Sequence, residues 1–349
     1  MTAQLEIAVE GRLGVIALNR PEAINALSLE MILGITRQLT AWRADPAIQA
    51  VLFEGRGARG FCAGGDVRYV REQVLAGRPD LADAYFDAEY RMNGLIASYP
   101  KPVVVMTDGI VMGGGIGIAG HAAFRFTTPT ARYAMPEANI GFVADVGVNW
   151  ILAKAPEPRA LLFLMSGQTV SGADVLALGL ADCCIDPTRF AEVRRGIVVA
   201  ARTGDVEPAL VALMQAESLQ AGERQLCEVA DACADAFAAE TAAEIVADFT
   251  EDVAGTAGAA YAEALARLSP TSLAAIVVSH RAARRLPDVH AVLDLDRRMA
   301  GWCARQPDFA EGVRAALVDR DRQPKWLPAN PEDVDLAGLK AAASGALRD

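Results

Sequence analysis

The order of apolar and polar residues predicts strands alternating with helices in the first half of the chain. Two alternating segments in 5–18, "LEIAVEGRLGVIAL", flank a glycine and predict a β-hairpin. Ser28 precedes apolar residues at helical spacing, so we expect it to cap a helix that ends before Pro46. Apolar runs at 50–55 and 101–120 add two strands, the second followed by a glycine-rich helix start. This alternation favours an α/β layer fold.

The pattern changes after about residue 186, where helical periodicity replaces the alternation. Residues 186–202 predict one helix, and 208–317 is rich in alanine and helix-periodic nearly throughout. We therefore expect an α/β core over 1–200 and an all-helical region over 201–349.

Two helix starts in the second region are marked by their own residues. Ser269 stands directly before Pro270, which is typical of an N-cap followed by the first helical position. Asp308 and Glu311 have the spacing of a capping box, so we expect Asp308 to cap the helix that follows it.

Composition and charge restrict the class of protein. The 349 residues are 52% hydrophobic and 22% charged, as in ordinary globular proteins, and no apolar run is long enough to span a membrane. The first residues have no basic flank and no apolar core, so we expect a cytoplasmic protein without a leader. A net charge of -11 without a basic, aromatic-bearing stripe disfavours nucleic acid as a partner.

Cysteine and histidine are too scattered to predict a metal site. No CxxC pair occurs among the six cysteines and only three histidines are present, so neither a zinc site nor a disulfide framework is expected. We expect buried free thiols instead, at Cys62, Cys183, Cys184, Cys227, Cys233 and Cys303.

Two stretches, 55–68 and 112–121, combine glycine with small residues. Glycines can serve turns with positive φ, or they can expose backbone N–H groups to a ligand. The second stretch satisfies G-x-G-x-x-G, but no acidic residue ends a following strand, so a nicotinamide-dependent dehydrogenase is the weaker interpretation. Four arginines bracket the first stretch, either as a solvated basic edge or as a site for a small anion: Arg56, Arg59, Arg68 and Arg71.

A second use of the glycines is oxyanion binding. An N–H group of Gly114 at a helix start and one of Gly65 can donate to a single oxygen and polarise a carbonyl. Glu137 and Asp145, two carboxylates in apolar surroundings, would then supply the base or the nucleophile.

The motifs that carry this chemistry resemble those of the crotonase superfamily, the enoyl-CoA hydratase/isomerase group. "NRPEAINALS", "GRGARGFCAGGDVR", "MGGGIGIAG" and "YAMPEANIGFVADVG" occur in that order and spacing. The carboxylates eight positions apart, with "SPTSL" and "DFAEGVRAALVDRDRQPKW", most resemble the 3-hydroxyisobutyryl-CoA hydrolase branch. The resemblance covers nearly the whole chain and implies a crotonase-like ββα spiral core.

The resemblance also implies roles for individual residues. Gly65 and Gly114 correspond to the oxyanion donors, Glu137 to the principal catalytic carboxylate and Asp145 to its partner. Further correspondences concern substrate binding: Glu89 in the acyl pocket, Asp66 at the end of "AGGD", and Ala23 to Ala26 along coenzyme A. Structural explanations stay open for three of them: Glu89 as an exposed helix residue, Glu137 as a helix N-terminal acid and Asp145 as a helix cap.

Hydrolysis is the reaction that these residues favour. Hydratases of the superfamily carry their first glutamate at the position of Gly117, and a hydration needs both acids. Thioester hydrolysis needs no metal or redox cofactor, because coenzyme A is part of the acyl-CoA substrate. Two alternatives remain: a hydratase or isomerase, and an inactive CoA-binding protein.

Two further expectations come from the resemblance. The hydrolase branch usually reads F-P-D-V-G-G-G, whereas this chain has Ala144, Val148 and Asn149 around Asp145, which bears on the choice of acyl group. Members commonly associate through their C-terminal helices, so we expect a homo-oligomer, with a trimer favoured.

Overall fold

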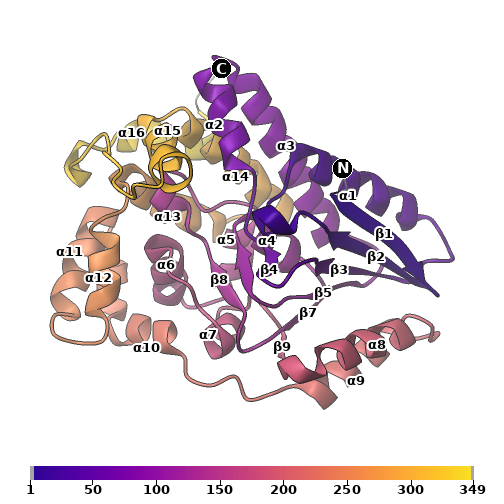
Figure 1. Ribbon diagram of the computed structural model, residues 1–349. Coiled ribbons are helices and arrows are strands. Elements are labelled where there is room, and N and C mark those ends of the chain that lie inside the picture. The colour runs from indigo at the N-terminus through magenta and orange to yellow at the C-terminus, as the bar shows by residue number, and fades with distance from the viewer. Residues whose placement is uncertain (1–3, 347–349) are drawn as a thin grey trace. The chain divides into compact units, whose positions relative to one another are not determined.

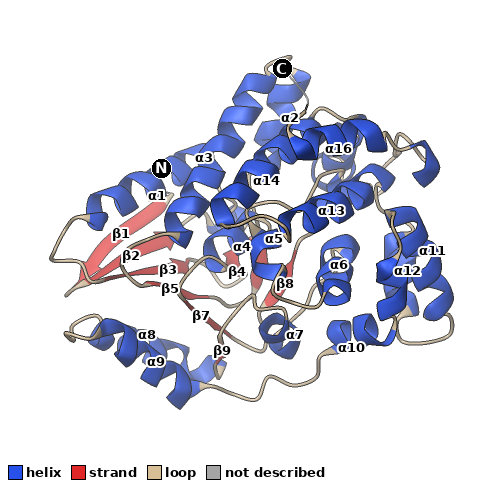
Figure 2. Ribbon diagram, turned by 180° about the vertical axis from the view of Figure 1, so that it is seen from behind, coloured by secondary structure: helices blue, strands red, loops and turns tan. Residues whose placement is uncertain are grey.

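The computed structural model describes residues 4–346 and divides the chain into two compact units of interleaved segments. The first unit consists of Met1–Gly65, Arg91–Tyr133 and Val170–Arg224, and the second of Asp66–Tyr90, Ala134–Thr169 and Gln225–Asp349. Figures 1 and 2 show their elements. The predicted division at residue 200 stays a prediction. The expected change of structure is present, since every element described beyond 200 is a helix.

The first unit is built on a six-stranded sheet. Its order is β1-β2-β3-β5-β7-β9, with bounds Leu5–Glu10, Leu13–Leu18, Ala50–Gly55, Val103–Met106, Phe124–Thr127 and Cys183–Cys184. β1 and β2 form the predicted antiparallel hairpin, and the other neighbours are parallel. β2 is buried at every position whereas β1 is mostly exposed, because β1 is the edge strand.

Helix α1 (Leu29–Arg43) covers one face of this sheet and confirms the predicted cap. The Ser28 hydroxyl accepts a hydrogen bond from the Met31 N–H at 3.2 Å. A Cβ added to Gly14 would lie 2.6 Å from the Trp42 ring, so glycine lets α1 approach β2 closely. The predicted apolar positions are all buried: Met31, Ile32, Ile35, Leu39 and Trp42.

Helices α8 (Phe190–Ala200) and α9 (Val206–Glu217) cover the other face, below the sheet in Figure 1. Leu13 and Val15 of β2 flank Gly14 and join the same buried cluster as Val193 and Ile197 of α8. Successive strand residues point to opposite faces, so both faces of the sheet are buried. This explains why β2, β3 and β5 are apolar at consecutive positions.

A second sheet carries the glycine-rich helix start. Its strands, in the order β4-β6-β8, are Gly60–Cys62, Ile110–Met112 and Arg132–Ala134. Helix α4 (Gly114–Ala119) begins just after β6, as the sequence predicted. The remaining short elements of the first unit are η1 (Pro21–Ala23), α7 (Gly172–Ala177) and η3 (Pro187–Arg189).

The second unit is helical. Its central helix, α13 (Pro270–Ala283), is buried on nearly all sides and packs against α5, α6, α11, α14 and α16. Its helices are α2 Val67–Leu75, α3 Pro79–Ala97 (which continues into the first unit), η2 Glu137–Ile140, α5 Val148–Leu152, α6 Glu157–Ser166, α10 Gln225–Ala232, η4 Ala234–Ala238, α11 Ala242–Asp252, α12 Ala259–Leu265, α13, α14 Val289–Ala304, α15 Pro307–Val313, η5 Arg314–Val318, η6 Pro331–Asp333 and α16 Leu336–Ser344.

Of the two predicted helix starts, one is confirmed and the other is wrong. Ser269 caps α13 and accepts a hydrogen bond from the Ser272 N–H at 3.0 Å. Asp308 does not cap α15, because Pro307 occupies the first turn and the N-cap is Gln306. The Asp308 carboxylate instead accepts hydrogen bonds from the Ser269 hydroxyl at 2.5 Å and the Leu327 N–H at 2.6 Å.

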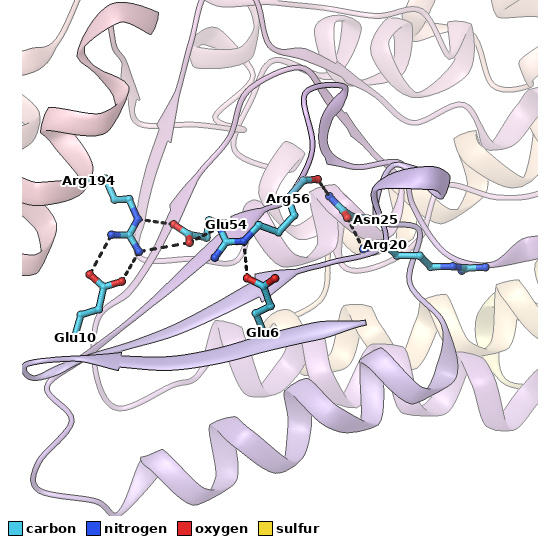
Figure 3. Close-up of polar contacts among 7 residues, drawn as sticks. All are labelled: Glu6, Glu10, Arg20, Asn25, Glu54, Arg56 and Arg194. Carbon is cyan, nitrogen blue, oxygen red and sulfur yellow. Dashed lines mark hydrogen bonds and ion pairs between the residues drawn. The ribbon is translucent and has the colours of Figure 1, made fainter. Parts of the chain in front are cut away.

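A network of charges ties α8 to the sheet of the first unit (Figure 3). The Arg194 guanidinium binds Glu10 of β1 at 2.6 Å and Glu54 of β3 at 2.7 Å. Arg56 binds Glu54 and Glu6, each at 2.7 Å. The Glu54 carboxylate is buried and is therefore paired from both sides. Arg194 lowers the pKa of the Glu10 carboxyl by donating to it.

We expect Arg194→Met to lower the free energy of unfolding by about 1–2 kcal/mol, because Glu54 loses one of its two cationic partners in a buried position. Urea unfolding measures the change. Arg195→Met, on the exposed neighbour, is the matched control and should change stability by less than about 0.5 kcal/mol. Equal effects of the two substitutions would show that the network adds nothing to stability.

Candidate active site

Asn25 organises the loops of the first unit that carry the predicted coenzyme A contacts. Its side chain is fully buried and its φ of 55° lies in the left-handed region. The amide Nδ2 donates to the carbonyls of Arg56 and Phe61, both at 2.9 Å, while Oδ1 accepts from the Arg20 N–H at 2.9 Å. Figure 3 shows Asn25 between Arg20 and Arg56. One side chain therefore joins the loop after β2 to the glycine-rich stretch 55–68.

Backbone pairing continues this connection towards Gly65. The Ala63 N–H donates to the Ile24 carbonyl at 2.9 Å, and the Leu27 N–H donates to the Gly64 carbonyl at 2.8 Å. Ala23 and Ala26 are half-buried in the same loop. Their contact with coenzyme A stays a prediction.

The two glycine-rich stretches lie against each other. A Cβ added to Gly64 would lie 3.7 Å from the Gly114 nitrogen, and one added to Gly115 would lie 2.6 Å from the Cys62 carbonyl oxygen. A side chain at 115 would clash with this backbone oxygen, and Gly64 has φ of 111°, which favours glycine. No residue within 4–346 accepts a hydrogen bond from the N–H of Gly65 or Gly114. Their role as oxyanion donors stays a prediction.

The four arginines around the first glycine stretch bind protein groups. Arg56 pairs with the glutamates described above, and Arg59 donates to the Pro21 and Glu22 carbonyls at 2.5 and 2.6 Å. Arg68 donates to the Leu317 carbonyl, and Arg71 to the Ala310 carbonyl at 2.7 Å. These contacts favour the structural interpretation of the basic cluster.

The predicted carboxylates of the second unit are buried. Glu137 is the first residue of η2, and its Oε2 has no hydrogen-bond partner in the described part of the chain. Glu89 on α3 is 3% exposed, so the alternative of an exposed helix residue is wrong. Asp145 accepts a hydrogen bond from the Tyr90 hydroxyl at 2.5 Å. Helix α5 has Gly147 as its N-cap, so the Asp145 carboxylate does not cap it.

Burial raises the pKa values of these three carboxyl groups, and repulsion between charges adds to the shift of two of them. Burial raises the pKa of Glu89 and of Glu137 well above the ordinary value, and the charge of Asp145 raises both further. Burial raises the pKa of Asp145 to about 7, although its hydrogen bond from Tyr90 acts in the opposite direction. A group of this kind holds protons near neutral pH and can exchange them with a substrate.

Sequence reasoning missed two polar partners of Asp145 and its loop. Tyr90 directly follows Glu89, and nothing in the sequence relates it to a residue 55 positions later. Asp296 on α14 is fully buried and accepts a hydrogen bond from the Gly147 N–H at 2.7 Å. The sequence does indicate that Asp296 is buried, because it lies at helical spacing with the apolar Val292 and Met299 on one face of the helix.

The residues that depart from the hydrolase pattern are built into the loop. The Asn149 amide donates to the Ala144 carbonyl at 3.1 Å, and its oxygen lies 3.0 Å from His280 Nδ1. Burial lowers the pKa of His280 to about 4, so the ring is neutral at pH 7. The bulkier loop therefore has a defined conformation, braced by a side chain of α13.

Asp66 has a structural role that its predicted substrate role does not exclude. Its carboxylate accepts a hydrogen bond from the Tyr69 N–H at 3.4 Å at the start of α2, and its own N–H donates to the Tyr85 hydroxyl. All six cysteines are buried thiols outside any disulfide, as expected.

The part of the chain that the structure describes has neither a cluster of metal-binding side chains nor a helix that could cross a membrane. Residues 4–346 contain no cluster of three or more side chains suited to a metal ion. None of their helices combines the length and apolar character needed to cross a membrane.

Comparison with known proteins gives the family. The model of the enoyl-CoA hydratase/isomerase family matches residues 13–342. The chain belongs to this family. A curated relative, the mitochondrial 3-hydroxyisobutyryl-CoA hydrolase of Gallus gallus, is 35% identical over 340 residues, covering 95% of this chain and 86% of that protein.

Two solved structures of the family share the fold over its full length. A carnitinyl-CoA dehydratase from Mycobacterium thermoresistibile has a TM-score of 0.89 and 34% identity, covering 98% of this chain and 96% of its own. An enoyl-CoA hydratase from Rhodobacter sphaeroides has a TM-score of 0.87 and 32% identity, covering 98% and 97%. The predicted crotonase-like fold is confirmed, and the relatives carry names from both the hydrolase and the hydratase branches.

We expect Asp145→Asn to stabilise the protein in a pH-dependent way. The folded-state pKa of about 7 lies above the ordinary 3.8, so the stability that this carboxyl contributes is lost as pH rises through 7. At about 1.4 kcal/mol per pKa unit, the variant should gain a few kcal/mol at pH 8 and progressively less towards pH 4. Thermal unfolding at several pH values measures this gain. Asp294→Asn, exposed on α14, is the control. If the stability difference between Asp145→Asn and the wild type did not change with pH, the raised pKa of Asp145 would be contradicted.

Proposed function

We propose that this family member hydrolyses the thioester of an acyl-CoA, with 3-hydroxyisobutyryl-CoA as the preferred substrate. The observation that carries the proposal is the pair of buried carboxyls at Glu137 and Asp145, combined with glycine at position 117. A hydration at Cα and Cβ needs a second glutamate at that place, whereas a hydrolysis needs one base or nucleophile and an oxyanion hole. The name of the Gallus gallus relative agrees with this choice.

The first unit contributes backbone donors in the proposed reaction. The thioester oxygen accepts hydrogen bonds from the N–H groups of Gly65 and Gly114, which keep their hydrogens free of protein acceptors. Negative charge gathers on that oxygen when the carbonyl is attacked, so preorganised donors lower the barrier. Asn25 holds the carbonyls of Arg56 and Phe61, which precede Gly65 in the same stretch, and this limits reorganisation of the loop that carries the donor.

The second unit contributes the carboxyls. Glu137 either takes a proton from water as the water oxygen attacks, or attacks the carbonyl carbon itself to give a mixed anhydride that water then hydrolyses. In both routes the C–S bond breaks, and coenzyme A leaves as a thiol after gaining a proton. Asp145, held by Tyr90, binds the 3-hydroxyl of the acyl group or passes that proton. Glu89 completes the polar surroundings of the acyl group.

The alternative reaction is hydration or dehydration of an acyl-CoA. It is favoured by the names of the two solved relatives, a dehydratase and a hydratase, which are about as similar to this chain as the hydrolase is. With glycine at 117, Asp145 would have to provide the second acid. An inactive protein that binds coenzyme A is the third candidate.

Three accompanying expectations belong to the proposal. The reaction as written uses water and needs no metal or redox cofactor. A homotrimer formed through the C-terminal helices is measurable by light scattering. A cytoplasmic location contrasts with the mitochondrial name of the Gallus gallus relative, and cell fractionation distinguishes the two.

Thiol release from a panel of acyl-CoA thioesters tests the reaction class. We expect the highest kcat/KM with 3-hydroxyisobutyryl-CoA, because its hydroxyl offers the proposed partner Asp145 a hydrogen bond that an unsubstituted acyl group lacks. The same panel is followed for hydration of crotonyl-CoA by loss of enoyl absorbance. Hydration without thiol release would overturn the hydrolase proposal, and coenzyme A binding without any turnover would favour the inactive protein.

We expect Glu137→Gln to lower kcat by at least about 10³-fold, because the amide can neither take a proton nor act as a nucleophile. Coenzyme A affinity, measured by calorimetry, should stay within about threefold. The matched control is Glu157→Gln on α6, where the glutamate pairs with Arg281 outside the proposed site. Retained turnover in Glu137→Gln would show that another group performs the attack.

A further inference from the structure

We infer that Asp296 is a positioning residue for Asp145. It acts by holding the backbone of the turn that follows Asp145. This inference rests on the proposed catalytic role of Asp145. Asp296 lies on α14 and Asp145 in the loop before α5, so the two residues come from distant parts of the sequence. The contact between them is indirect: Asp296 Oδ2 accepts the Gly147 N–H at 2.7 Å.

The turn that Asp296 holds has an unfavourable backbone conformation. Val146 has φ of 54° and Gly147 has φ of 72°, so two successive residues occupy the left-handed region. A β-branched residue rarely adopts a positive φ, and such a conformation persists only where the surroundings enforce it. The hydrogen bond to Asp296 falls directly on this turn.

Other contacts fix the remaining sides of Asp145. The Tyr90 hydroxyl holds its carboxylate at 2.5 Å, and the Val148 N–H donates to its carbonyl at 3.0 Å. The Asn149 amide holds the Ala144 carbonyl on the preceding residue. Asp296 therefore provides a side-chain anchor for the turn after Asp145, while Asn149 provides one before it.

The chemistry of Asp296 makes the inference testable by a conservative variant. Its side chain is fully buried, its Oδ1 has no partner within the described residues, and burial raises its pKa well above the ordinary value. An amide of the same shape keeps the oxygen that accepts the Gly147 N–H. An apolar side chain of similar volume removes the acceptor and leaves a buried N–H unsatisfied.

The experiment compares Asp296→Asn and Asp296→Leu with Asp308→Leu. Asp308 is a matched control, since it is also fully buried and accepts a backbone N–H, that of Leu327, but lies outside the turn. Each variant is measured for kcat and KM in thiol release and for hydrogen exchange of the Gly147 amide. Asp296→Ala serves as a second acceptor-free variant if Asp296→Leu does not fold.

We expect Asp296→Leu to lower kcat by roughly 10- to 100-fold with KM within about threefold, because the Asp145 carboxyl is displaced while coenzyme A binding is kept. Exchange of the Gly147 amide should accelerate at least about tenfold. Asp296→Asn should restore both quantities to within about threefold of the wild type. Asp308→Leu should lower the melting temperature but leave kcat of the folded enzyme within about threefold.

Two results would overturn the inference. One is wild-type protection of Gly147 in the acceptor-free variants, and the other is an equal loss of kcat in Asp296→Leu and Asp308→Leu. Failure of the hydrolase proposal gives a different result, namely a wild-type protein that releases no thiol from any acyl-CoA. The Gly147 exchange rates and any hydratase activity then still decide the role of Asp296.

Discussion

The desolvation of a few carboxyl groups is the constraint on which the second unit depends. Glu89, Glu137 and Asp145 are withdrawn from water, and burial raises all three pKa values, with the charge of Asp145 raising those of Glu89 and Glu137 further. Removing charged groups from water costs several kcal/mol each unless they pair or become neutral. The Tyr90 hydroxyl donates to Asp145, and no cation within residues 4–346 forms an ion pair with any of the three. The cost is offset by the apolar packing of helices such as α13.

The first unit solves a different problem, which is to keep backbone N–H groups unpaired and yet fixed. Asn25 contributes the fixing with one side chain that makes four hydrogen bonds at a left-handed backbone position. Gly115 lets the two stretches approach so closely that a side chain there would clash with the Cys62 backbone. Rigidity at this place comes from side-chain–backbone contacts rather than from regular secondary structure, since α4 is only six residues long.

Local structure was predictable from the sequence wherever neighbouring residues determine it. The hairpin, the face of α1 and the caps at Ser28 and Ser269 depend on spacing within a few residues, and all are present. Asp308 shows the limit of such patterns, because Pro307 and the distant Leu327 N–H gave its carboxylate another partner. Asp296 and Gly147 are 149 positions apart, so only the tertiary fold relates them. The catalytic candidates were predicted from the glycine-rich stretches and the two carboxylates in apolar surroundings, and the resemblance gave each of them a role.

The pair of Asn149 and His280 has an evolutionary consequence. Asn149 stands where the hydrolase pattern that the sequence resembles has glycine, and its oxygen is the partner of Nδ1 in the buried His280 ring. A substitution at either position destabilises the protein unless the other position changes too. Glycine at 149 would leave the Nδ1 atom of His280 without its partner, and an apolar residue at 280 would leave the Asn149 side-chain oxygen without its partner. The two positions should therefore covary among close relatives. The effect of a substitution at 149 then depends on the residue at 280. An evolutionary path from the glycine-rich hydrolase pattern to this loop favours the order of substitutions that leaves the fewest buried polar groups unpaired at each step.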